Sequence, residues 1–187
     1  MVKKILIALV VVVAGLAIVI ALQPSTFRVS RSAAIAAAPS DAFAQVNDLH
    51  SWQAWSPWAK LDPAAKTAFE GAASGTGAVF RWSGNDEIGE GSMTVVESRP
   101  PSQIKIKLAF VRPFASTADT LFEFAPAGSG TAVTWTMSGE NNFFSKAFCL
   151  FMGGPDKMIG PDFEKGLAQM KTVVEGRKLA PLLPSFK

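Results

Sequence analysis

The chain has 187 residues, 49% of them apolar, and a mean hydropathy of +0.25. Its 18 basic side chains nearly balance 15 acidic ones, and Lys3 and Lys4 supply much of the excess, which argues against a nucleic-acid binder. The single cysteine and single histidine exclude a disulfide framework and the common zinc sites, so we expect neither a metal nor a cofactor.

The first segment is an unbroken apolar run over residues 5–22. As a helix it is about 27 Å long, close to the thickness of a bilayer's hydrocarbon core. Because Lys3 and Lys4 precede the run, the positive-inside bias places the N-terminus in the cytoplasm. We expect residues 1–23 to form a single-pass anchor in a bacterial inner (plasma) membrane, with the following domain on the periplasmic side. A cleaved signal peptide is the alternative, although the run is longer than such peptides usually have.

The next segments predict a strand and then a short helix. Residues 27–37 combine spaced apolar side chains with small polar ones, as in a strand. Pro39, followed by a serine and an aspartate, is a helix-start signal. After this helix come Trp52, Trp55 and Trp58, which recur every third residue and are expected either to rim a pocket or to cap one end of the sheet.

Residues 66–138 change to a period of two, most cleanly over residues 103–110, and turn-rich connections separate the runs. This pattern predicts an antiparallel meander. Residues 143–152 are expected to form a separate helical turn or two. A long final helix follows, with Phe163, Leu167, Met170 and Val174 on one face and Asp162 and Glu164 near its start. We expect one domain over residues 24–180 and a loose tail over residues 181–187.

A bent antiparallel sheet closed by one long helix is an α+β arrangement, and such folds often leave a cavity between helix and sheet. The predicted inward side chains are large and apolar, although a solid interlocked core is the alternative. The expected ligand-binding set is Trp55, Trp58, Phe80, Trp82, Phe110, Phe122, Phe124, Trp135, Met137, Phe163, Leu167 and Met170.

Candidate catalytic groups are few. Glu90 and Glu97 lie seven residues apart on one predicted strand, so without a bulge they point to opposite faces and at most one can enter the cavity. A carboxyl buried among aromatic rings would have a raised pKa and could act as an acid or base. His50 is the single histidine, and no G-x-S-x-G elbow accompanies it, so a Ser-His-Asp relay is not expected.

Five segments carry a resemblance to a known family: Ala38 to Phe43, Asp48 to Trp58, Phe80 to Asn85, Gly89 to Thr94 and Val133 to Gly139. On these segments the chain resembles the START-like helix-grip superfamily, and within it the polyketide cyclase and dehydrase branch, also called SRPBCC proteins. The resemblance covers about residues 26–178. It implies a hydrophobic cavity under the last helix and no universal catalytic motif.

Three functions fit these observations. The first is a membrane-anchored domain that binds an apolar small molecule or lipid in the cavity, with residues 5–22 in the membrane. The second is a cyclase- or dehydrase-like enzyme that uses a cavity carboxylate from Glu90 or Glu97. The third is a protein-interaction module whose partner docks on the loop from Trp52 to Trp58, which requires a solid core and exposed rings.

Overall fold

The computed structural model describes residues 1–141 and 143–179, so the predicted tail over residues 181–187 lies outside the described residues. One seven-stranded antiparallel sheet has the order β1-β7-β6-β5-β4-β3-β2. Its strands are β1 (Thr26–Ile35), β2 (Lys66–Gly71), β3 (Ala78–Ser83), β4 (Glu90–Arg99), β5 (Gln103–Arg112), β6 (Ser116–Ala127) and β7 (Gly130–Glu140).

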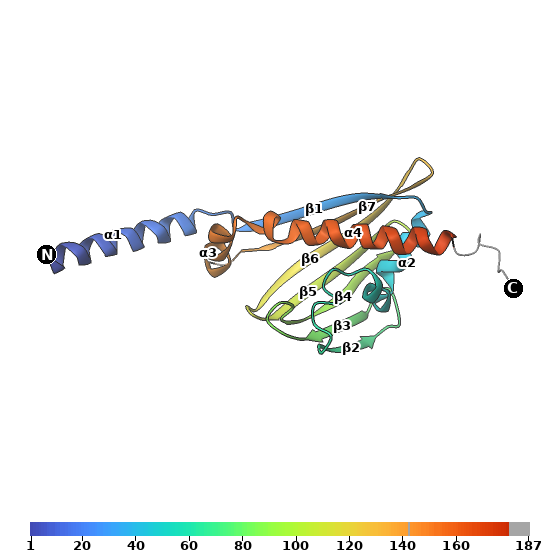
Figure 1. Cartoon of the computed structure of the whole chain (residues 1–187), viewed down its shortest axis with the longest axis horizontal. Coiled ribbons are helices and arrows are strands. Elements are labelled where there is room, and N and C mark those ends of the chain that lie inside the picture. Colours follow the sequence, from blue (N-terminus) through green and yellow to red (C-terminus); the bar gives the residue numbers. More distant parts are fainter. Residues whose placement is uncertain (142, 180–187) are drawn as a thin grey trace.

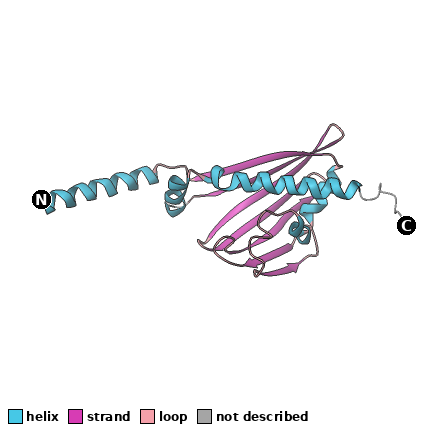
Figure 2. Ribbon diagram, in the orientation of Figure 1, coloured by secondary structure: helices cyan, strands magenta, loops and turns pink. Residues whose placement is uncertain are grey.

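The helices are α1 (Val2–Ala21), α2 (Pro39–Asn47), a 3-10 helix η1 (Leu49–Ala54), α3 (Phe143–Met152) and α4 (Pro155–Leu179). The long helix α4 runs along the β1 edge of the curved sheet, while α2 and η1 cover the sheet at one end (Figure 1). Figure 2 shows the long helix α4 passing across the strands, with α1 extending away from them. The fold is the α+β helix-grip that the sequence predicts.

The last helix begins earlier than its apolar stripe indicates. The stripe suggests a start near Asp162, but α4 begins at Pro155 and passes through Pro161. Asp156 is therefore the acidic residue in its first turn, and Asp162 and Glu164 lie inside the helix. The two glycines before Pro155 have positive φ angles, and they separate α4 from α3.

The interior has two parts that differ in packing. In the closed half, α2, η1 and α4 cover the sheet. Eight of the core side chains there are 4% exposed or less: Val46, Leu49, Trp55, Phe122, Phe124, Leu167, Met170 and Val174. In the open half, Trp58, Trp82, Leu108, Phe110 and Ile159 are only partly buried.

The apolar helix α1 extends away from the sheet (Figure 1). Only Ile20 in it is buried, and no α1 residue belongs to the core cluster. Among the described residues it is the one helix long and apolar enough to cross a membrane, with a mean hydropathy of 3.0. A signal sequence near the N-terminus has the same properties, so length and composition fit either assignment.

Candidate ligand-binding site

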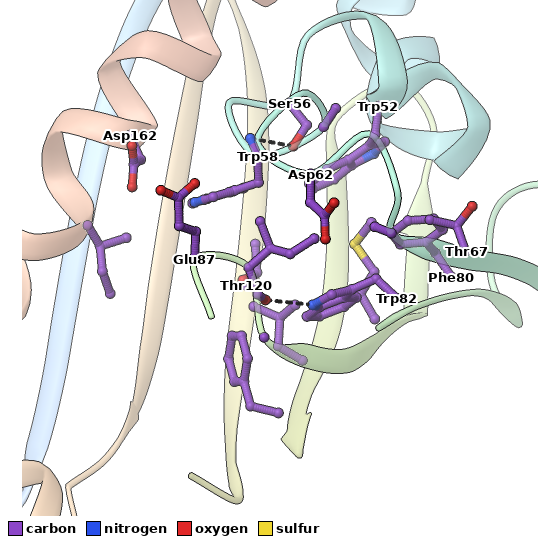
Figure 3. Close-up of a pocket in the computed structure, with 18 of the residues that line it drawn as sticks. Trp52, Ser56, Trp58, Asp62, Thr67, Phe80, Trp82, Glu87, Thr120 and Asp162 are labelled. Atoms are coloured by element: carbon purple, nitrogen blue, oxygen red, sulfur yellow. Dashed lines mark hydrogen bonds between the residues drawn. The ribbon is translucent and has the colours of Figure 1, made fainter. Parts of the chain in front are cut away.

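A pocket of about 630 Å³ lies in the open half, between the first turns of α4 and the middle of the sheet. Figure 3 shows how tryptophan and phenylalanine side chains from several elements converge on it. This volume is within the range of small-molecule sites. The pocket exists because α4 packs mainly on β1, which leaves β3 to β6 in this half covered by loops rather than by a helix.

The aromatic wall at the α4 side is held by ring contacts. The Trp135 ring stacks on the Phe163 ring with centroids 4.0 Å apart. Trp58 meets Trp135 edge-on at 5.8 Å, so three elements share one apolar surface. Gly166 permits the close approach of α4, because a Cβ atom there would lie 2.9 Å from the Trp135 ring.

The opposite wall is organised by Trp82. Its indole Nε1 donates to the Ile88 carbonyl oxygen at 2.9 Å and holds the β3–β4 loop over the pocket. Asp62, which lies between η1 and β2, joins that segment to the β3–β4 loop. Its carboxylate accepts from the backbone N–H of Asn85 at 2.8 Å and from the backbone N–H of Ala64 at 3.0 Å. Beside Gly91 the ring of Trp82 occupies the space that a side chain would need.

Seven of the twelve residues expected to bind a ligand line the pocket: Trp58, Phe80, Trp82, Phe110, Trp135, Met137 and Phe163. The other five, Trp55, Phe122, Phe124, Leu167 and Met170, do not line it and are packed in the closed half. The inward direction of Phe122, Phe124, Leu167 and Met170 was predicted correctly, but α2 and η1 pack against this part of the sheet and α4. Direction along a strand therefore does not distinguish a pocket wall from a packed core.

Glu90 and Glu97 do not line the pocket. A bulge between Val95 and Glu97 shifts the alternation by one residue, so the opposite orientation expected for a strand without a bulge does not apply, and neither carboxylate enters the pocket. Glu90 accepts from Arg112 and Ser83. Glu97 pairs with Lys105 and Arg99, and its hydrogen bond with Lys105 is the main cause that lowers the pKa of its carboxyl.

Sequence reasoning missed several pocket residues. Leu108 belongs to the same alternating run as Phe110, and Ile159 precedes Phe163 by one helical turn. The strand and helix periods could therefore have predicted both residues. The loop residues gave no such signal. Besides Asp62, acidic Asp86, Glu87 and Asp162 line the pocket, against one basic residue, Arg112. Figure 3 shows Glu87 and Asp162 in the part of the pocket next to α4.

Two buried polar atoms of the pocket wall have no hydrogen-bond partner: the Thr120 hydroxyl and the Trp135 indole Nε1. Thr120 is 3% exposed and Trp135 is 2% exposed. They occupy inward positions on adjacent strands, since Thr120 pairs with Met137 and Trp135 pairs with Phe122. A buried polar group without a partner costs about 1–3 kcal/mol, so a ligand oxygen that reached either atom would recover part of this cost.

Other chemistry has little support in the described part of the chain. No group of three or more metal-binding side chains occurs among residues 1–141 and 143–179. Trp52 and Trp55 are 6% and 0% exposed, so the tryptophan loop does not present the exposed aromatic patch that the interaction-module hypothesis requires. Burial raises the pKa of the Cys149 thiol, which disfavours a reactive thiolate.

Solved structures of low sequence identity share the fold. A crystal structure from Chromobacterium violaceum has a TM-score of 0.57 at 16% identity, covering 82% of this chain and 99% of that chain. The Aha1 dimer of Colwellia psychrerythraea has 0.57 at 15% identity, covering 80% and 96%. The di-domain ARO/CYC protein StfQ, from the steffimycin biosynthetic pathway, has 0.59 at 13% identity, covering 82% and 52%.

No curated protein matches the sequence. A family model, by contrast, matches residues 26–175, which span the sheet from its first strand and nearly all of α4. The matched family is described as polyketide cyclase / dehydrase and lipid transport. With that match over most of its length, and with the helix-grip fold and its apolar pocket, this chain belongs to the polyketide cyclase/dehydrase and lipid transport family.

Proposed function

We propose that this protein binds an uncharged, mainly apolar small molecule or lipid that carries an oxygen atom, and that α1 anchors it in a bacterial inner membrane. The observation that carries the proposal is the apolar pocket of about 630 Å³ with two unpartnered polar atoms in its wall. Burial of the ligand's apolar surface supplies the binding free energy, about 25 cal/mol per Å² before entropic costs.

The oxygen atom is inferred from the polar atoms of the wall. The indole N–H of Trp135 can only donate, whereas the Thr120 hydroxyl can donate or accept. A ketone, ether or hydroxyl oxygen can accept from either group. Such a ligand can recover a hydrogen bond that an alkane leaves unmade.

The uncharged character is inferred from the acidic side chains of the pocket. Four carboxylates face one guanidinium there, and Arg112 is already paired with Glu90. A fatty acid would bring a further negative charge beside Glu87 and Asp162, which costs free energy at a partly desolvated site. Alcohols and ketones carry no such penalty.

The anchor is inferred from α1, whose apolar side chains are exposed along almost its whole length. The lysines at its start support a cytoplasmic N-terminus and a periplasmic domain over residues 24–180. Tethering keeps the pocket at a high effective concentration near membrane-soluble ligands.

The proposal is tested by mass spectrometry of an organic extract from the gently purified full chain. We expect one defined neutral compound in amounts close to the protein's own. The variant Leu108→Trp places an indole in the pocket and should therefore retain little of this compound. Val96→Trp is the matched control, since Val96 is 51% exposed on the neighbouring strand and does not line the pocket.

A titration makes the result independent of what is co-purified. A dibrominated long-chain alcohol should quench the tryptophans of the pocket and bind at least tenfold more weakly to Leu108→Trp. The alkane and the carboxylate of the same chain length should bind more weakly than the alcohol to the native chain. Equal binding to Leu108→Trp and Val96→Trp, with no compound in either extract, would overturn the proposal.

An enzymatic function of the cyclase or dehydrase type is a weaker candidate. The carboxylates expected to serve it, Glu90 and Glu97, do not line the pocket. The pocket carboxylates Asp86, Glu87 and Asp162 remain to favour it, because Asp62 is already used in holding two loops together. Conversion of a bound ligand that Asp162→Asn abolishes without weakening its binding would establish this function.

A further inference from the structure

Helix α3 exposes large apolar side chains next to the C-terminal end of α1. Phe148, Phe151 and Met152 are 46%, 72% and 54% exposed. The helix carries one basic residue, Lys146, and no acidic one. Exposed aromatic side chains gathered on one short helix are unusual on a surface that faces only water.

The position of α3 is fixed by its lysine. The Lys146 ammonium donates to the Ala21 carbonyl oxygen and to the Ser25 hydroxyl, each at 3.3 Å. These two residues are the last of α1 and the link to β1, so α3 lies where α1 meets the domain (Figure 1). If α1 lies in a bilayer, α3 is at the depth of the bilayer surface.

The β5–β6 hairpin reaches the same place. A second hollow is lined by Ser25 and Thr26 from the α1–β1 link and by Ala115 and Ser116 from the start of β6. The residue before Ala115 in this hairpin is Phe114, which is 61% exposed. An apolar side chain is thus exposed on a second element that borders the end of α1.

The ligand pocket adjoins both elements. Arg112 and Pro113, which precede Phe114, line it from the hairpin. Met158 and Ile159 line it from the first turns of α4, a few residues after Met152. The β5–β6 hairpin and the start of α4 therefore lie near the end of α1 and also line the ligand pocket.

We propose that Phe114, Phe148, Phe151 and Met152 form a membrane-docking face that inserts into the surface layer of the bilayer holding α1. Aromatic side chains on a short helix with a lysine are typical of segments that lie in this layer, and Lys146 is suited to anionic headgroups. Because the face is continuous with the end of α1, a phospholipid bilayer is its occupant. The ligand then passes between bilayer and pocket without crossing bulk water, a step that rests on the proposed function.

The docking face is tested with the full chain in nanodiscs of phosphatidylcholine and phosphatidylglycerol. An environment-sensitive fluorophore is attached to Phe151→Cys or Phe114→Cys in a Cys149→Ser background. Ala127→Cys in the β6–β7 hairpin, at the other end of the domain (Figure 1), is the control. We expect brominated lipids to quench labels at 151 and 114 several-fold more than at 127, and aqueous iodide to show the reverse order.

Equal accessibility of all three labels to iodide would overturn the docking face. So would protein–protein crosslinking through position 151, because it would show a second copy of the chain on this surface instead of lipid.

The route of the ligand has its own measurement. Phe114→Asp combined with Phe151→Asp changes no pocket residue. It should slow transfer of the dibrominated alcohol from vesicles to the pocket at least tenfold and leave the final level of quenching unchanged. An unchanged transfer rate would overturn the direct route. If no ligand binds while the labels are still quenched by lipid, the docking face stands and the proposed function fails.

Discussion

The two halves of the interior are built from the same kind of side chain, yet one is solid and the other is hollow. Phe122 and Phe110 are both inward-facing phenylalanines of neighbouring strands. Phe122 is fully buried beneath Trp52 and Trp55, whereas Phe110 is only partly buried and borders the pocket. The difference comes from what covers the sheet. Helices fill the space over one half, and loops bridge the other.

The largest expected difference in the free energy of unfolding is between the alanine variants of these two phenylalanines. Phe122→Ala removes a side chain from close packing and should lower the free energy of unfolding by about 3–5 kcal/mol. Phe110→Ala should cost about 1–2 kcal/mol, because its ring already borders empty space. Urea denaturation of both variants measures the contrast. Equal losses would mean that the open half is as tightly packed as the closed one.

The second contrast lies within α4, where two glycines have different surroundings. A Cβ at Gly166 would lie 2.9 Å from the Trp135 ring and 3.1 Å from the Pro57 ring, so Gly166→Ala should destabilise the protein by about 1–3 kcal/mol. A Cβ at Gly176 would meet nothing within 4 Å. Gly176→Ala should therefore stabilise by up to about 1 kcal/mol through helix propensity. Thermal unfolding of the two variants tests whether the first lowers the melting temperature and the second raises it.

If Gly166→Ala were as stable as the native chain, α4 would not be held against Trp135. The pocket would then be deformable, and its volume in solution would differ from the one described.

The sequence predicted well which side chains point into the domain. It predicted poorly which helices and loops pack over them. Alternation placed Phe80, Trp82 and Trp135 on the inward face, and the helical period placed Phe163 opposite them. These are local properties of the chain. Whether an inward ring meets another side chain or a void depends on where α2 and the loops fold back, which is a long-range outcome that no period encodes.

The errors have the same origin. One bulge after Val95 reversed the expected side of Glu97, because a period of two transmits a single insertion to every later position. Glu87 and Asp162 border the same pocket only because a loop and a helix from distant parts of the chain come together.

The third contrast concerns two buried threonines. The Thr131 hydroxyl donates to the Ala37 carbonyl oxygen at 2.7 Å, whereas the Thr120 hydroxyl has no partner. Thr131→Val should cost about 1–2 kcal/mol of stability and leave ligand affinity unchanged. Thr120→Val removes a buried hydroxyl that has no partner, so it should raise the melting temperature. It should weaken binding of the dibrominated alcohol about 3–10-fold, as expected for one lost hydrogen bond.

The matching alkane is the control for Thr120→Val, since it cannot hydrogen-bond and should bind both forms equally. A loss of stability in Thr120→Val without any change in alcohol binding would show that this hydroxyl serves the fold and not the ligand.

The smallest effect concerns how α4 is held over the open half. Arg31 of β1 donates to Asp156 at 2.8 Å and to Glu164 at 2.6 Å, and Gly160 leaves room for its guanidinium. The hydrogen bond from Arg31 is the main cause that lowers the pKa of Asp156 below its ordinary value of 3.8. A lowered pKa means that the folded state holds this carboxyl's proton more weakly than the unfolded state does. The stabilisation is therefore complete above about pH 5 and disappears as the pH falls through the folded-state pKa.

Asp156→Asn removes this contribution at every pH. We expect the stability curves of the native chain and the variant to be separated at pH 7 and to converge as the pH falls below 3.8. The gap should be small and should shrink further in high salt, because the carboxylate is exposed to solvent. A gap that stayed constant down to pH 2 would show that the substitution acts through packing at the start of α4, and that the ion pair does not hold this end of the helix over the pocket.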